Sequence, residues 1–155
     1  MKIVNFFNPF VMFTSMHMNA KPMKQMETNN RKKIDFLKKY DFENIGHRGA
    51  RGLAVENTLL AFEKAIEVGV NTIEMDVVVT KDEEILVSHE SWMSSTTCML
   101  NGQKIEHDAE EEHNIYEMNY AETQAYDCGS LIHPKFDDQE TEGSTKPLLK
   151  EVLQM

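Results

Sequence analysis

Cysteine is scarce in this sequence, which contains two among its 155 residues, Cys98 and Cys128. Two cysteines are too few for the disulfide framework of a small secreted domain, and these two do not form the Cys-x-x-Cys spacing of a metal site. A single bridge between them is possible, but the prediction from the sequence is two free thiols.

Long apolar runs are also missing, since no stretch approaches the ~18 apolar residues of a membrane span. The apolar stretch Ile3–Phe13 near the N-terminus is interrupted by Asn5, Asn8 and Pro9, and no clear cleavage site follows it. A secretory signal is therefore only weakly indicated. We interpret residues 1–40 as a leader or linker, which leaves the compartment open between cytoplasmic and periplasmic or secreted.

Basic residues are few after position 51. Residues 1–51 carry ten Lys and Arg against four Asp and Glu, whereas residues 52–155 carry six against twenty-two, for a formal net charge of -10 over the chain. An acidic body argues against a nucleic-acid partner, because binding to phosphate backbones needs a basic surface. The same charge suits a protein that attracts a divalent cation.

Residues 41–90 carry the clearest secondary-structure pattern. It predicts a strand, a helix and two further strands, over residues 42–46, 56–69, 71–80 and 85–90. Asn57 or Thr58 can cap the helix, and Gly69 can end it. A strand–helix–strand unit of this length predicts that its two major strands are parallel, with a right-handed crossover.

Residues 91–146 do not continue this alternation of strands and helices. They are polar and acidic, with one plausible helix near Glu117–Tyr126 and an exposed loop around Phe136–Thr145. So long a departure predicts an insertion. Pro147 then opens a new amphipathic helix, so the sequence is expected to stop in the middle of a fold.

The segment Thr72–Val79, "TIEMDVVV", alternates between two faces of its predicted strand. Glu74 and Asp76 share one face, about 7 Å apart at ~3.3 Å per residue. The other face carries the apolar side chains of Ile73, Met75, Val77 and Val79. Two carboxylates are costly to bury unpaired, and Ca²⁺ or Mg²⁺ would relieve that cost. An edge strand with a solvated face is the alternative.

The stretch "GHRGARG" follows the first predicted strand. Functional groups of parallel α/β folds gather at the carboxyl ends of strands, so His47 and His89 are expected beside the two carboxylates. A histidine pair next to a metal can supply a general acid and a general base for phosphoryl transfer. Arg48 and the backbone N–H groups of Gly46–Gly52 can hold phosphate oxygens. We therefore interpret this loop as an anion-binding lip.

Residues 44–90, with "GHRGARGLAVENTLLAFEKAIEVGVNTIEMDVVVTKDEEILVSHE", resemble the opening of the glycerophosphodiester phosphodiesterases. That family reads His-Arg-Gly, then Pro-Glu-Asn-Thr at a helix start, Glu-x-Asp, Thr-Lys-Asp-Gly and a strand ending in His-Asp. A weaker resemblance extends to Leu153. There "YAETQAYDCGS" is similar to the segment that closes the family's substrate-side insertion, and "KPLLKEVL" is similar to the helix after it.

The resemblance implies an α/β fold of the (βα)8 TIM-barrel type, represented by its first βα units and a substrate-side insertion. The barrel domain would span residues 41–155, with the insertion at about 91–146. It also implies hydrolysis of glycerophosphodiesters to an alcohol and glycerol 3-phosphate. The partner would be a small phosphodiester such as glycerophosphocholine. We expect no nucleic-acid partner, and no transmembrane segment in the protein.

The same resemblance implies roles for five residues. His47 and His89 would be the acid/base pair, and Arg48 would bind the phosphate. Glu74 and Asp76 would hold the divalent cation, Ca²⁺ or Mg²⁺. The family's third metal carboxylate comes from the next barrel strand, and this sequence ends before it.

Two smaller departures from the family pattern are Val55 in place of proline and Glu83 in place of the turn glycine. Two alternative functions stay open: a phospholipase D-like relative acting on lysophospholipid or sphingolipid headgroups, and an inactive fragment or binding module. The polar insertion favours a water-soluble diester, because it shows no membrane-docking stripe. The remaining histidines are interpreted as ordinary surface residues: His17, His107, His113 and His133.

Overall fold

The computed structural model describes residues 2–3, 12–16 and 43–155 of the chain. The elements of the main α/β region are β1 (Lys2–Ile3), β2 (Met12–Met16), β3 (Ile45–His47), α2 (Leu59–Glu67), β4 (Thr72–Val79), β5 (Ile85–Val87) and α4 (Leu149–Val152). Between β5 and α4 lie β6 (Met99–Leu100), β7 (Gln103–Lys104), η1 (Glu110–His113), η2 (Ile115–Glu117), α3 (Tyr120–Thr123) and β8 (Tyr126–Asp127). Most of the predicted leader, residues 1–40, lies outside the described residues, and the predicted domain limits stay a prediction.

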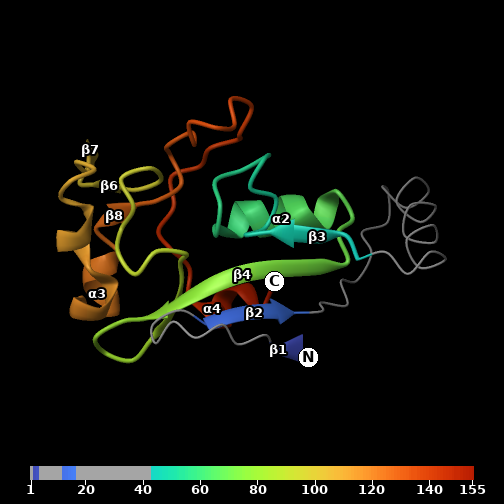
Figure 1. Cartoon of the computed structure of the whole chain (residues 1–155), viewed down its shortest axis with the longest axis horizontal. Coiled ribbons are helices and arrows are strands. Elements are labelled where there is room, and N and C mark those ends of the chain that lie inside the picture. Colours follow the sequence, from blue (N-terminus) through green and yellow to red (C-terminus); the bar gives the residue numbers. More distant parts are fainter. Residues whose placement is uncertain (1, 4–11, 17–42) are drawn as a thin grey trace.

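Strand β4 is the centre of the main sheet (Figure 1). It pairs in parallel with β3, as the strand–helix–strand pattern predicts, with His47 opposite Glu74. On the other edge β2 pairs antiparallel with β4, so that Met12 lies opposite Val77. Two short segments far apart in the sequence therefore flank the strand that carries the predicted carboxylates.

Strand β5 runs antiparallel to β4, with Val87 opposite Val77. The Ser88 N–H donates to the Asp76 carbonyl at 3.0 Å, so the residue that follows β5 lies beside Asp76 of β4. We expected His89 to reach the site from the carboxyl end of a parallel strand, and that reasoning is wrong. His89 arrives there because a hairpin folds β5 back along β4.

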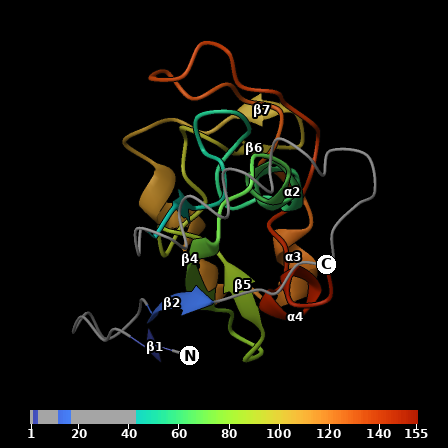
Figure 2. The same ribbon diagram turned by 90° about the vertical axis from the view of Figure 1, so that its right-hand side faces the viewer.

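Helix α2 covers one face of the sheet, and α4 lies on the same side of β4 (Figure 2). Thr58 caps α2, since its side-chain oxygen accepts a hydrogen bond from the Ala61 N–H. Gly69, with φ of 79°, takes the left-handed conformation just after the helix, as predicted. Buried apolar side chains from both helices and the sheet form the core here: Phe62, Ala65, Ile73, Met75, Val77, Val87 and Val152.

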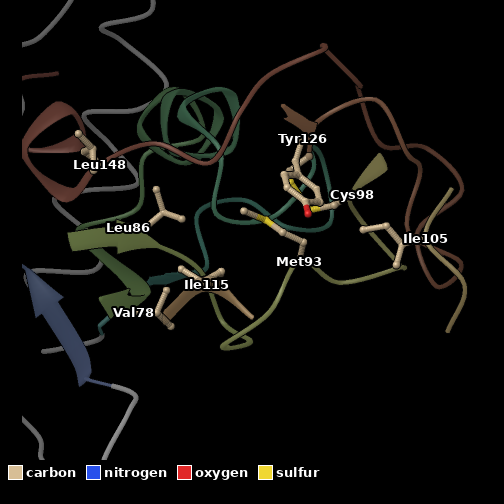
Figure 3. Close-up of a cluster of buried hydrophobic side chains, with 9 residues drawn as sticks. Val78, Leu86, Met93, Cys98, Ile105, Ile115, Tyr126 and Leu148 are labelled. Atoms are coloured by element: carbon tan, nitrogen blue, oxygen red, sulfur yellow. A yellow bond between two sulfur atoms is a disulfide. The ribbon is translucent and has the colours of Figure 1, made fainter. Parts of the chain in front are cut away.

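The predicted insertion builds a second core with the opposite face of the sheet (Figure 3). Its buried members are Val78, Leu86, Met93, Cys98, Ile105, Ile115, Tyr126, Cys128 and Leu148. Cys98 and Cys128 form a disulfide bond, so the prediction of two free thiols is wrong. The bond joins the neighbourhoods of β6 and β8, which pair with each other in a small sheet with β7. The predicted helix near Glu117–Tyr126 shortens to α3.

The carboxylate of Asp127 ties together the two ends of the loop after β8. Its Oδ1 accepts from the N–H groups of Gly129 at 3.0 Å and Ser144 at 3.2 Å, and its Oδ2 accepts from the Ser130 hydroxyl at 2.5 Å. A Cβ at position 129 would lie 2.1 Å from the carbonyl oxygen of Glu142, so only glycine fits there. Asp127 and Gly129 thus close the exposed loop of the insertion.

Candidate active site

Strand β4 places the two predicted carboxylates on the face away from α2. The Asp76 side chain is 1% exposed and that of Glu74 is 20% exposed, so one lies inside the protein and the other near its surface. Burial raises the pKa of Glu74. The hydrogen bond that its carboxylate accepts from the Arg48 N–H opposes this rise, and the charge of Asp76 adds to it.

Arg48 lies between two buried carboxylates. Its Nη1 donates to Glu56 Oε1 at 2.5 Å, and its Nε lies 3.4 Å from Asp76 Oδ2. Its backbone φ is 54°, in the left-handed region, which turns the Arg48 N–H toward Glu74 Oε2 at 2.9 Å. A guanidinium in this position compensates the burial of Glu56 and Asp76, and removing it would leave buried charges unpaired.

The glycine-rich lip is closed by hydrogen bonds of its own backbone. The Gly49 N–H donates to the Glu74 carbonyl at 3.3 Å, and the Ala50 N–H donates to the Ala61 carbonyl at 2.8 Å. Gly49 has φ of 83°, and a Cβ there would lie 2.7 Å from the backbone of Ala61. The N–H groups of residues 48–50 already have acceptors in the protein, so the predicted backbone cradle for phosphate is wrong at these three positions.

His47 ends β3 with its ring beside Glu74. The ring is 55% exposed, and its Nε2 lies 3.8 Å from Glu74 Oε2. On the other side of the ring, Nη1 of Arg51 lies 3.4 Å from Nδ1. Arg51 also forms an ion pair with Glu56, at 3.1 Å between Nη2 and Oε2. Sequence analysis singled out neither Arg51 nor Glu56 for this role.

His89 follows β5 and forms a pair with Glu90, at 2.7 Å between Nδ1 and Oε1. This hydrogen bond raises the pKa of His89, against the effect of burial. The charges of Arg48 and Asp76 also act on the ring. The two predicted histidines and the two predicted carboxylates therefore gather around β4.

Lys146 is a buried cation that sequence analysis missed. It is 6% exposed and interacts electrostatically with Glu90, Glu56 and Asp76. Burial lowers its pKa, and the three carboxylates oppose that effect. The carbonyl of the next residue, Pro147, accepts from the Val87 N–H at 2.8 Å, which holds the segment against β5. A single sequence carries no signal that separates such a lysine from an exposed one.

Asp76 Oδ1 and Asn57 Oδ1 are among the buried side-chain oxygen atoms without a hydrogen-bond donor, and they belong to two side chains in contact. Asn57, 2% exposed, donates from its Nδ2 to Asp76 Oδ2 at 3.2 Å. Its predicted role as helix cap is taken by Thr58. Oxygen ligands from carboxylates and amides are those that Ca²⁺ and Mg²⁺ take, so these residues and Glu74 fit such a cation. Among the described residues, however, no three or more His, Cys, Asp or Glu side chains are grouped so that they could hold a metal.

The other described histidines have partners elsewhere. His107 lies 3.4 Å from Glu110, and His113 lies 2.8 Å from the Tyr126 hydroxyl. His133 contacts the Phe136 ring, with 5.1 Å between centroids. His17 lies outside the described residues.

The cavity found in the structure lies away from the predicted site residues. A cavity of about 380 Å³ lies between the start of α2, α3 and residues 142–147, and no predicted site residue lines it. In the part of the chain that the structure describes, no helix has the length and apolar character needed to cross a membrane.

Comparison with curated proteins gives relatives from animals and bacteria. Lysophospholipase D GDPD1 of Rattus norvegicus is 34% identical over 128 residues, which cover 81% of this chain and 35% of that protein. The putative glycerophosphodiester phosphodiesterase YhdW of Bacillus subtilis (strain 168) is 37% identical over 109 residues, 70% of this chain and 38% of that protein. The chain thus spans little more than a third of the length of these relatives.

Solved structures agree with this relationship. A putative glycerophosphoryl diester phosphodiesterase from Silicibacter pomeroyi DSS-3 matches with 36% identity and a TM-score of 0.65, over 71% of this chain and 38% of that one. An Oleispira antarctica phosphodiesterase in complex with the product sn-glycerol-3-phosphate matches with 28% identity and a TM-score of 0.54, over 74% of this chain and 40% of that one.

The family model of the glycerophosphoryl diester phosphodiesterases matches residues 47–155. The fold of these relatives is of the TIM-barrel type, and the described residues carry the first βα units of such a barrel. The resemblance seen in the sequence is confirmed: this chain belongs to the glycerophosphoryl diester phosphodiesterase family.

Proposed function

We propose that the protein is a metal-dependent phosphodiesterase that hydrolyses glycerophosphodiesters to an alcohol and glycerol 3-phosphate. One observation carries the proposal: His47, His89, Glu74 and Asp76 gather around β4, within the segment that bears the family's motifs. The product found in the Oleispira antarctica relative supports the same substrate class.

The histidines are the proton-transfer pair of this proposal. Hydrolysis adds the oxygen of water to phosphorus and breaks the bond between phosphorus and the oxygen of the alcohol. One imidazole accepts the proton that water loses, and the other donates a proton to the departing alcohol. His47 and His89 approach β4 from two different segments, which suits donation and acceptance on opposite sides of a phosphate.

Glu74, Asp76 and the Asn57 amide oxygen are the groups that would hold the cation. When bound, a divalent cation would neutralise phosphate charge as a Lewis acid. Asn57 keeps Asp76 Oδ2 occupied through its amide N–H, which leaves the donor-free Oδ1 for a cation. Arg48 is assigned to the phosphate because it follows His47 in the family's His-Arg-Gly motif, and its guanidinium lies between Glu56 and Asp76 beside the site.

Turnover of histidine variants tests the catalytic assignment in the full-length protein. His47→Ala and His89→Ala should each lower turnover by about 10² or more, while the affinity for the cation stays nearly unchanged. The matched control is His107→Ala, since His107 is 89% exposed and pairs with Glu110 in the insertion. If either site variant kept the turnover of the control, its acid/base role would be withdrawn.

A second candidate is a lysophospholipase D activity, favoured by the 34% identity to Lysophospholipase D GDPD1. Rates of product release from glycerophosphocholine and from lysophosphatidylcholine separate the two. Preference for the first substrate supports our proposal, and a strong preference for the lipid supports the alternative. A protein that binds the cation but hydrolyses neither would be a binding module.

A further inference from the structure

Residues 133–140 of the insertion, which we call the strap, pack against the end of the lip. Gln139 is 6% exposed, and its Nε2 donates to the carbonyls of Arg51 at 2.6 Å and Ala54 at 3.1 Å. The Glu140 N–H donates to the Leu53 carbonyl at 2.8 Å. The Gln139 amide oxygen accepts from the His133 N–H at 2.8 Å, which closes the strap on itself. Three hydrogen bonds, to the carbonyls of residues 51, 53 and 54, thus hold the end of the lip and the residues just after it against a segment more than 80 positions away.

The strap also holds the Arg51 side chain. Its guanidinium lies 5.2 Å from the centroid of the Phe136 ring, within the range of a cation–π contact. Glu56 holds the same guanidinium from the other side, at 3.1 Å. The Arg51 side chain is 21% exposed, so most of it is enclosed by these partners. Its position is therefore set jointly by the lip and the insertion.

Arg51 faces Nδ1 of His47, and this contact fixes where the neutral ring carries its proton. A guanidinium only donates hydrogen bonds, so Nδ1 must be the acceptor and Nε2 must carry the hydrogen. Nε2 is the atom that faces Glu74, at 3.8 Å. We propose that Arg51, held by the strap, is a positioning residue that keeps neutral His47 in its Nε2–H form and directs that N–H toward the site.

This inference rests on the proposed function for its consequence, since the Nε2–H of neutral His47 can then donate a hydrogen bond to a phosphate oxygen, whereas transfer of a proton to the departing alcohol needs an imidazolium form. His89 lies in the opposite situation. Its Nδ1 faces the carboxylate of Glu90, which only accepts when ionised, so Nδ1 carries a hydrogen there and Nε2 is left for proton exchange. The two rings are thus oriented by partners of opposite kind, a donor for His47 and an acceptor for His89.

Histidine tautomers can be measured by two-bond ¹H–¹⁵N NMR spectra of the chain labelled with ¹⁵N-histidine. The signals of His47 are assigned by their loss in His47→Gln. At a pH where the ring is neutral, the wild type should show a protonated Nε2 and an unprotonated Nδ1. In Arg51→Met the ratio of the two tautomers should fall about fivefold, the factor that corresponds to one hydrogen bond of ~1 kcal/mol.

Two further variants test the strap, and a third variant serves as the control. Phe136→Leu keeps an apolar side chain without the aromatic face, and Gln139→Ala removes the fastening to the lip, so each should shift the ratio in the same direction. Lys150→Met breaks the 3.3 Å ion pair between α4 and Glu84, which involves neither the strap nor Arg51, so the ratio should not change. The backbone spectrum of each variant shows whether the fold is kept.

An unchanged ratio in a folded Arg51→Met protein would overturn the proposal. A change in Arg51→Met alone, with none in the two strap variants, would overturn the part assigned to the insertion. A change in Lys150→Met as large as in Gln139→Ala would show general loosening rather than positioning, which also contradicts it. The tautomer is measured without turnover, so loss of the proposed phosphodiesterase activity would leave this test intact.

Discussion

Residues 44–90 and residues 91–146 reach their structures by different means. The first segment forms a parallel strand pair joined by a capped helix, and its elements follow local signals in the sequence. The second contains short strands and turns that are held by a disulfide and by the carboxylate of Asp127. The segment with the catalytic candidates is thus built on regular structure, whereas the insertion depends on a few contacts between distant residues.

This difference teaches which residues a sequence reveals. His47, Glu74 and Asp76 stand out because each lies at a defined place on a strand. Arg51, Gln139 and Lys146 do not, because their roles come from contacts across up to 88 positions. The insertion therefore positions groups of the site through contacts that local pattern cannot encode.

Loss of the disulfide should have the largest effect on stability. The bond closes a loop of 30 positions, so Cys98→Ser with Cys128→Ser should lower the free energy of unfolding by about 3 to 4 kcal/mol. Urea unfolding of oxidised, reduced and double-variant protein measures it. Hydrogen exchange should show that β6 and β8 lose protection first. Equal loss in β4 would contradict the separation of the two regions.

Neutralising Asp127 should cause the second-largest loss of stability. Burial alone would raise the pKa of Asp127, but the Ser130 hydroxyl and the N–H groups of Gly129, Ser144 and Ser130 lower it below its usual value of 3.8. A lowered pKa means that its stabilisation is present above pH 3.8 and is lost as the pH falls through the folded-state pKa. Asp127→Asn should therefore cost about 2 kcal/mol at neutral pH.

Thermal unfolding of wild type and Asp127→Asn as a function of pH checks this sign. The difference in melting temperature should be greatest at neutral pH and should shrink below the usual pKa of 3.8. A difference that grows on acidification would contradict the assignment.

Removing the Asn57 side chain should weaken the proposed cation site in residues 44–90. Asn57→Ala leaves Asp76 Oδ2 without its amide donor, and loss of such a partner of a metal ligand lowers metal affinity by about tenfold or more. Calorimetric titration with Ca²⁺ and Mg²⁺ measures the change. Thr58→Ala, which removes the helix cap beside it, is the matched control and should leave the affinity unchanged.

The smallest effect is expected at the turn between β4 and β5, where Glu83 has φ of 66°. A side chain in this left-handed conformation costs about 1 kcal/mol, so Glu83→Gly should stabilise the protein by about that amount. Glu83→Ala removes the same charge but keeps a Cβ, and it should give no gain. A gain of the same size in both variants would show that charge, rather than backbone strain, is relieved.

Sequence pattern predicted most of the frame around the site. The parallel pair of β3 and β4, helix α2 and the faces of β4 follow from helical and strand periodicity. No direction was predicted for β5, and the argument from the carboxyl ends of parallel strands does not apply to it, because a hairpin makes it antiparallel to β4. The bond between Cys98 and Cys128 was missed because pairing depends on the contact of β6 with β8, which have no strong periodic pattern of their own.

The most direct test of the account is cation binding by two variants that each remove one carboxylate. We expect weak, saturable heat of Ca²⁺ or Mg²⁺ binding in the wild type, with Glu74, Asp76 and the Asn57 amide as the side-chain ligands proposed among the described residues. Asp76→Asn should abolish that heat, whereas Asp127→Asn, which changes the charge equally but lies in the insertion, should leave it unchanged. Binding to Asp76→Asn with wild-type affinity would contradict the assignment of the cation site to β4.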